Sequence, residues 1–143
     1  MNSCAARINA RPESPSSSPD PCTHYVIVRS DLPLGVLAAQ LVHAAGESSP
    51  GNLEEGTYAI VLAVPDEQAL GHLAVRLLRA GIAFRAIREP DLPYNNALMA
   101  LGLVPQRKSV LRPFLSSLPL YRGSKVPEKA PEVPMKISEI MPE

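Results

Sequence analysis

The sequence predicts an α/β protein: a single small domain built as a three-layer α/β/α sandwich around a four-stranded mixed sheet. Short apolar runs rich in β-branched residues alternate along the chain with longer segments whose apolar residues recur every three or four positions. Strands that alternate with helices form a sheet that is covered by helices on both faces. The length of 143 residues suits one such domain.

Proline and serine concentrate near the two ends of the chain. Residues 11–21 contain four prolines and four serines, and residues 123–143 contain four prolines among alternating charges. Segments of this composition cannot bury enough apolar surface to offset the entropy of an ordered chain. We therefore expect disordered tails at residues 1–23 and 123–143 and a folded domain at residues 24–122.

The first strand and helix are predicted from residues 24–48. Residues 24–29 form a short apolar run typical of a buried strand. Ser30 or Asp31 can cap the helix that follows, and Pro33 suits its first turn. One apolar face is expected on this helix, at Leu34, Leu37, Ala38, Leu41, Val42 and Ala45.

The remaining elements follow in the same way. Residues 57–64 predict a second strand, and the acids after Pro65 start a helix that Gly81 ends. Its apolar face is Leu70, Leu73, Ala74, Leu77 and Leu78. Residues 82–88 and 97–103 predict two further strands, one of them antiparallel because their connection is short. Pro113 limits a last helix to a turn or two.

Composition bounds the classes of function. The formal net charge is zero, so only local patches of charge can indicate a nucleic-acid partner. No stretch of 18 apolar residues predicts a membrane span, and no signal peptide is visible, so we expect a cytoplasmic protein. The two cysteines, Cys4 and Cys22, lack metal-ligand spacing. We expect free thiols, no metal and no cofactor.

Residues 25–48, YVIVRSDLPLGVLAAQLVHAAGES, resemble the opening of type II peptidyl-tRNA hydrolases. That family has a buried strand, an Asp-Leu turn and a helix with a Gly-Lys-x-x-Ala-Gln-x-x-His-Ala pattern. The order of later elements agrees over residues 24–122. The family's lysine falls on Val36 and its acidic residue on Glu89, and the loop after that acid is shorter here. The chain looks like a divergent branch that lacks the lysine. The matching positions are Asp31, Leu32, Gly35, Ala39, Gln40, His43 and Ala44.

The resemblance implies hydrolysis of the ester between a peptide and the 3′ end of tRNA, which recycles tRNA. Ester hydrolysis needs an activated water and a donor for the developing oxyanion. His43 can act as the base or hold the ribose, Gln40 can donate through its amide, and Glu89 or Asp91 can orient the histidine. Val36 cannot supply positive charge. Either another cation substitutes, such as Arg29 or Arg88, or the chemistry is slow or lost.

Further residues are candidates for binding the substrate. Ser48 and Ser49 follow the helix that carries His43, and Asn95 and Asn96 lie in a loop at a strand end, where they can read ribose or base edges. The same residue types are also ordinary in turns. A late cluster of five basic residues suits tRNA phosphates or simply a solvated edge. It comprises Arg107, Lys108, Arg112, Arg122 and Lys125.

Three functions stay open at this point. The first is a peptidyl-tRNA hydrolase that works without a cofactor. The second is a non-catalytic domain that binds tRNA ends or nucleotides, which the loss of the lysine at Val36 favours. The third is a structural domain whose proline-rich tails recruit a partner. The oligomeric state is equally open, with a homodimer among the alternatives.

Overall fold

The computed structural model describes residues 20–123. The tails expected at residues 1–23 and 123–143 lie almost wholly outside these described residues. The first strand, β1 (Cys22–Arg29), begins two residues before the expected domain boundary. It does so because Cys22 and Thr23 pair with Arg107 and Gln106.

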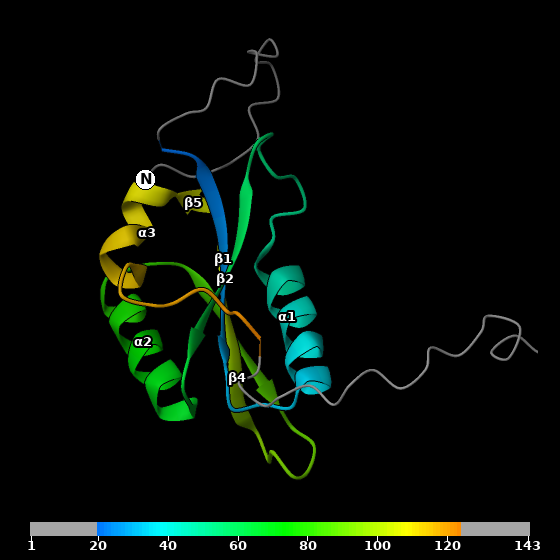
Figure 1. The fold of residues 1–143 in the computed structure, drawn as a ribbon. Helices are drawn as coiled ribbons and strands as arrows, with labels where there is room; N and C mark the ends of the chain where they lie inside the picture. Colours follow the sequence, from blue (N-terminus) through cyan, green and yellow to red (C-terminus); the bar gives the residue numbers. More distant parts are fainter. Residues whose placement is uncertain (1–19, 124–143) are drawn as a thin grey trace, which may run out of the picture.

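The described chain folds in the predicted order of elements (Figure 1). One addition is the short strand β5, which lies between β4 and the last helix, so the sheet has five strands where the sequence predicts four. The other bounds differ from the expected ones by at most two residues at the strands. They are α1 (Leu34–Ser48), β2 (Tyr58–Val64), α2 (Glu67–Arg79), β3 (Phe84–Glu89), β4 (Ala97–Leu103), β5 (Gln106–Arg107) and α3 (Lys108–Leu115).

The sheet is mixed, with the order β2-β1-β4-β3, and β5 pairs with the start of β1. β1 is parallel to β2, whereas β4 is antiparallel to both β1 and β3. The prediction that one of the last two long strands is antiparallel is therefore confirmed. Figure 1 shows α1 on one face of the sheet and α2 and α3 on the other, which confirms the three-layer α/β/α sandwich.

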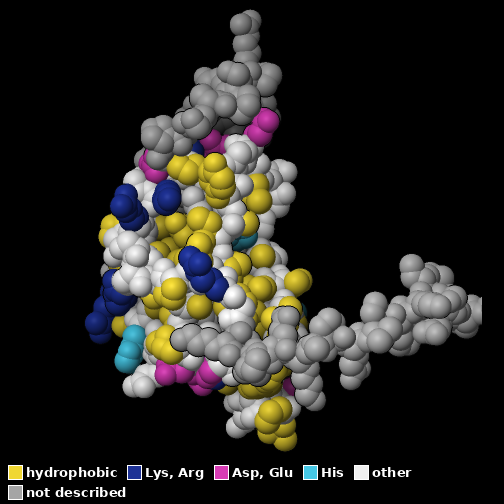
Figure 2. Space-filling view, in the orientation of Figure 1, with side chains coloured by type: hydrophobic (Ala, Val, Ile, Leu, Met, Phe, Trp, Pro, Cys, Tyr) yellow, Lys and Arg dark blue, Asp and Glu magenta, His cyan; other side chains and the backbone are white. Residues whose placement is uncertain are grey.

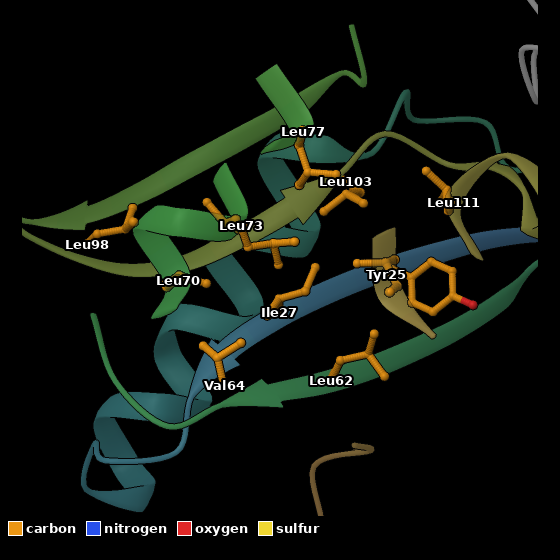
Figure 3. Packing of buried hydrophobic residues seen from close by; sticks show 12 residues of the cluster. Tyr25, Ile27, Leu62, Val64, Leu70, Leu73, Leu77, Leu98, Leu103 and Leu111 are labelled. Atoms are coloured by element: carbon orange, nitrogen blue, oxygen red, sulfur yellow. The ribbon is translucent and has the colours of Figure 1, made fainter. Parts of the chain in front are cut away.

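The larger hydrophobic cluster lies between the sheet and the helices α2 and α3 (Figure 3). Leu70 and Leu77 of α2 are fully buried against Ile27 of β1 and Leu103 of β4. Burying a leucine side chain stabilises a fold by about 1.5–3 kcal/mol. The predicted start of α2 is confirmed, because the Asp66 carboxylate accepts a hydrogen bond from Ala69 N at 2.9 Å. Leu78, expected on its apolar face, is instead 71% exposed.

The buried face of α1 differs from the predicted one. Leu34 and Val42 are 60% and 74% exposed, so their expected burial is wrong. Gln40 and Ser48 are both 3% exposed and face the sheet beside Leu37 and Ala44. Polar residues replace leucine and valine on this face because each finds a hydrogen-bond partner on a distant strand.

Gly102 of β4 allows α1 to approach the sheet closely. A Cβ atom at this position would lie 2.6 Å from Ser48 Oγ and closer still to the carbonyl oxygen of Ala44. Ser48 Oγ donates a hydrogen bond to that carbonyl at 2.6 Å and lies 2.7 Å from Nε2 of His24 on β1. Since the single hydroxyl hydrogen goes to Ala44, His24 Nε2 carries a hydrogen and donates it to Ser48.

Burial lowers the pKa of His24 below its ordinary value of 6.5. At pH values above that ordinary value, the folded and unfolded chains are both neutral at His24. As pH falls below it, the unfolded chain binds a proton that the folded chain still refuses, so stability is lost until the lower folded pKa is reached.

We predict that the free energy of unfolding, measured by chemical denaturation, declines between pH 6.5 and 5 partly because of His24. The slope from one such group cannot exceed about 1.4 kcal/mol per pH unit. His24→Gln should flatten the decline, whereas His72→Gln, which changes an exposed helix residue, should leave it in place. An unchanged pH profile in His24→Gln contradicts the prediction.

Cys22 lies in β1, where it is 3% exposed and disulfide-bonded. The expectation of a free thiol at Cys22 is therefore wrong. It arose because the sequence places this residue in a tail rather than in the first strand. Among residues 20–123, no helix is long and apolar enough to cross a membrane.

Candidate active site

Three strands end at one edge of the sheet. β1 ends at Arg29, β2 at Val64 and β3 at Glu89, and all three run in the same direction because β4 is antiparallel to β1 and β3. The first turns of α1 and α2 and the loop between β3 and β4 lie at the same edge, at the lower end of Figure 1. Such carboxyl edges are where α/β proteins bind ligands.

On the α1 side of this edge, the structure brings Gln40 and Glu89 together. Gln40 Nε2 donates a hydrogen bond to Glu89 Oε2 at 3.1 Å, and Asp91 N donates to Glu89 Oε1 at 3.2 Å. These two donors fix the orientation of the carboxylate. Each carboxylate oxygen has a further lone pair with which to accept a proton from a bound water.

The loop after β3 places three further predicted residues near Glu89. Asn96 N donates a hydrogen bond to the carbonyl oxygen of Glu89 at 2.7 Å. Asn95 and Asn96 adopt left-handed backbone conformations with φ of 48° and 68°, which asparagine tolerates better than most residues. The side chains of Asn95, Asn96 and Asp91 are exposed in this loop, which directly follows Glu89.

His43 and Val36 complete the row on α1. His43 is exposed three residues after Gln40 and forms no hydrogen bond within residues 20–123. Val36, one turn before Gln40, is half-buried and packs against the cluster beneath α1. An apolar contact thus occupies the position where the resemblance places a lysine.

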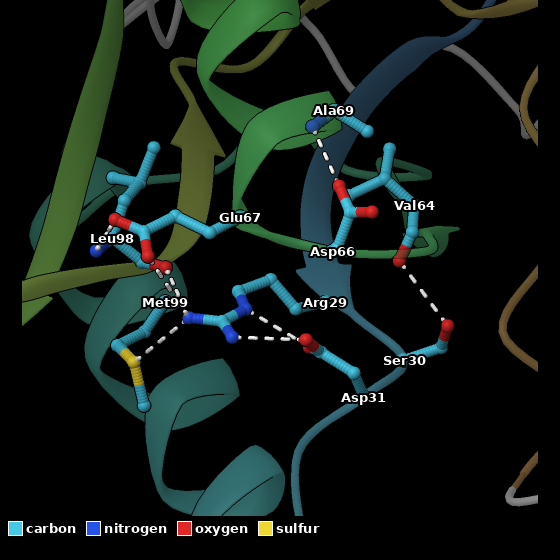
Figure 4. A network of polar contacts seen from close by, with 9 residues as sticks. All are labelled: Arg29, Ser30, Asp31, Val64, Asp66, Glu67, Ala69, Leu98 and Met99. Carbon is cyan, nitrogen blue, oxygen red and sulfur yellow. Dashed lines mark hydrogen bonds and ion pairs between the residues drawn. The ribbon is translucent and has the colours of Figure 1, made fainter. Parts of the chain in front are cut away.

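Arg29 lies on the opposite, α2 side of the edge (Figure 4). Its Nε and Nη2 atoms donate to the two carboxylate oxygens of Asp31 at 2.9 Å each, and Nη1 donates to the carbonyl oxygen of Leu98 at 3.1 Å. Glu67 Oε2 lies 3.8 Å from Arg29 Nη1. The hydrogen bonds to Asp31 hold the pKa of Arg29 above its ordinary value, against the opposing effect of burial.

The contacts of Arg29 and Asp31 bear on the cap of α1 and on the cation that could replace the family's lysine. Neither Ser30 nor Asp31 caps α1, because Asp31 is taken up by Arg29 and Pro33 holds the N-cap position. Arg29 is also not a spare cation for the missing lysine, since two acids already neutralise it. The Arg-x-Asp spacing is visible in the sequence, but the contact with Glu67 spans 38 positions and is not.

A pocket of about 600 Å³ opens on the same α2 side. Arg29, Glu67, His72 and Arg88 line it together with the start of β4. Arg88 is exposed and donates to the carbonyl oxygen of Asn96 at 3.1 Å. Ile87 before it packs on the α1 side, whereas Arg88 lines the pocket on the α2 side and therefore lies away from Gln40.

The structure does not bring the other predicted residues to Gln40. Ser48 is buried two helical turns further on, about 12 Å along α1, and Ser49 binds Gly51 N at 3.2 Å in the next loop. Arg107 and Lys108 lie by the opposite end of β1, about 23 Å from Arg29 along the strand. Arg107 is paired with Glu54 at 3.0 Å.

A small α/β/α domain with a carboxylate–amide pair at the carboxyl edge of its sheet is the class that the structure defines. Residues 22–121 match the family described as peptidyl-tRNA hydrolase PTH2, and the chain belongs to that family. No curated protein matches the chain. One similar solved structure is a protein of unknown function, Atu0240, from Agrobacterium tumefaciens strain C58. It is 17% identical, and the match covers 71% of this chain and 98% of that one, with a TM-score of 0.48.

Proposed function

We propose that this protein hydrolyses the ester bond between a peptide and the 3′ end of tRNA. Membership of the peptidyl-tRNA hydrolase family supports the class of substrate. The observation that carries the proposal for this chain is the hydrogen bond from Gln40 to Glu89, which fixes a carboxylate at the carboxyl edge of the sheet.

Glu89 acts as the general base in this proposal. It accepts a proton from a water molecule whose oxygen attacks the ester carbonyl carbon, and a tetrahedral oxyanion forms. When that intermediate collapses, the ribose 3′ oxygen leaves and receives the proton from Glu89. Gln40 is a positioning residue, because it acts by holding the carboxylate.

The neighbouring residues bind the substrate end. His43 is exposed beside Gln40 on α1 and can hold the ribose or stack on the terminal base. Asn95 and Asn96 have exposed side chains in the loop that follows Glu89, and their amides can read ribose hydroxyls. Asp91 contributes its backbone N–H to Glu89, so its carboxylate is dispensable for orienting the base.

Val36 is the reason to expect slow chemistry. Within residues 20–123, no arginine or lysine forms a hydrogen bond or ion pair with Glu89 or Gln40. Loss of one donor that stabilises an oxyanion typically costs on the order of 10²–10³ in rate. This gap also favours the second candidate function, a domain that binds tRNA ends without cleaving them.

The test is cleavage of an N-blocked aminoacyl-tRNA by the purified protein and by Val36→Lys. We predict slow turnover by the parent chain and a rate raised by on the order of 10² in Val36→Lys, because the new ammonium group would lie one turn from Gln40. The lysine stem can keep the packing that Val36 makes.

Val42→Lys is the matched control, since it adds the same charge to α1 at a side chain that is 74% exposed and away from Gln40. Equal gains in both variants would mean that the charge merely attracts tRNA. If neither the parent nor Val36→Lys cleaves the substrate but both still bind tRNA, the proposal of a hydrolase is rejected in favour of a domain that binds tRNA without cleaving it.

A further inference from the structure

Four exposed cations gather on the side of the molecule that carries α2 and α3. We name them the basic face: Arg76 and Arg79 of α2 with Lys108 and Arg112 of α3. The spacings of three and four residues place each pair on one side of its helix. Figure 2 shows dark blue side chains over this part of the surface, whereas magenta side chains gather toward its two ends.

The two helices hold the basic face together as one surface. Arg76 lies with its guanidinium carbon 6.0 Å from the centroid of the Phe114 ring, so α2 and α3 touch at this point. Leu73 and Leu77 of α2 share one buried cluster with Leu111 and Leu115 of α3. The core beneath them therefore fixes the positions of the two helices that carry the four charges.

Within residues 20–123, none of these four cations forms an ion pair. The ion pairs within residues 20–123 involve only Arg29 and Arg107 among the basic residues. No acid follows Glu67 on α2, and α3 contains none. Asp20 lines a shallow pocket with Lys108 and Arg112 and brings one negative charge to the edge of this surface, where its carboxylate accepts hydrogen bonds from N and Oγ of Ser109 at 2.8 and 2.7 Å.

The basic face differs from the basic cluster that the sequence predicts. Arg107 is paired with Glu54, and Lys125 lies outside the described residues. The structure instead adds two arginines that lie some thirty positions earlier in the chain. Like-signed charges that lie close together repel one another, and a polyanion relieves that repulsion. Guanidinium groups in addition bind phosphates with two parallel hydrogen bonds.

We propose that the basic face binds the phosphate backbone of the tRNA body, at a distance from the ester. The choice of tRNA rests on the proposed function. The basic face and the Gln40–Glu89 pair lie on opposite sides of the sheet, so the RNA passes around the carboxyl edge. Helix α2 connects the basic face to this edge. Arg76 lies about 14 Å along the helix from Glu67, and Glu67 lines the pocket at the carboxyl edge together with Arg88.

The experiment measures binding of deacylated tRNA as a function of salt, for the parent and for a variant with Arg76→Gln, Arg79→Gln, Lys108→Gln and Arg112→Gln together. Loss of four phosphate contacts is expected to weaken binding by on the order of tenfold or more near 0.1 M salt. It should also lower the slope of log affinity against log salt by about three to four.

Arg85→Gln removes one exposed charge from β3, outside the basic face, and should change little. Paired variants of α2 alone and α3 alone, each checked by circular dichroism, replace the fourfold variant if it does not fold. Unchanged affinity and slope in the fourfold variant, or an equal loss per charge in Arg85→Gln, would overturn the inference.

A second readout separates this inference from the proposed function. The fourfold variant should raise KM for N-blocked aminoacyl-tRNA but leave kcat/KM unchanged for an N-blocked aminoacyl ester of a short CCA oligonucleotide. If the parent binds tRNA through the basic face but cleaves neither substrate, the hydrolase fails and the binding surface stands. If both substrates are cleaved equally well by parent and variant, the binding surface fails and the hydrolase stands.

Discussion

Replacing Glu89 by glutamine is expected to lower kcat/KM for N-blocked aminoacyl-tRNA by about 10²–10⁴, the range that a positioned general base contributes. Glutamine has nearly the same shape, so Gln40 keeps an oxygen to which it can donate. The new side chain cannot accept a proton from water. The measurement is single-turnover deacylation with enzyme in excess, which isolates the chemical step from product release.

Asp91→Asn is the control that decides between the two acids. Asp91 contacts Glu89 through its backbone N–H at 3.2 Å, and this contact survives a change of side chain. We therefore expect Asp91→Asn to retain most of the parent rate. A large loss in Asp91→Asn together with an active Glu89→Gln would assign the base to Asp91 instead.

Replacing Gly102 by alanine is expected to lower the free energy of unfolding by about 1–3 kcal/mol or more, the cost of overpacking a well-packed core. The added Cβ would lie 2.6 Å from Ser48 Oγ and 2.9 Å from the carbonyl carbon of Ala44. Both are held in place, because Ser48 donates to Ala44 and accepts from His24. The helix α1 must therefore shift away from the sheet.

Gly46→Ala is the matched control, in the same helix but at an exposed position with nothing within 4 Å of the added atom. It should raise stability by up to about 1 kcal/mol, because alanine favours a helix over glycine. Urea denaturation of both variants beside the parent measures the difference. A Gly102→Ala variant as stable as the parent would show that α1 can yield without cost.

Local patterns in the sequence predict the elements of this fold and their order. The alternation of apolar runs predicts the three layers, Asp66 marks the start of α2, and Gly81, with a φ of 72°, marks its end. These signals are reliable because each depends on residues within a few positions of one another. The resemblance over residues 25–48 likewise identifies the family that the comparison of residues 22–121 shows.

The tertiary structure alone decided which polar residues are buried and which charges act together. Gln40 can be buried because it donates a hydrogen bond to Glu89, which lies 49 positions away in the sequence. Ser48 can be buried because it is hydrogen-bonded to His24, which lies 24 positions away on another element. Helical periodicity instead assigns burial to Leu34 and Val42, which are exposed. Likewise, Arg107 of the predicted basic cluster forms an ion pair with Glu54, whereas Arg76 of α2 packs on Phe114 of α3, the helix that carries Lys108. The physical reason is the same in each case. The periodicity of apolar residues predicts only which face of a helix is buried on average. The partner of a buried polar group or of a charge is set by packing between distant segments.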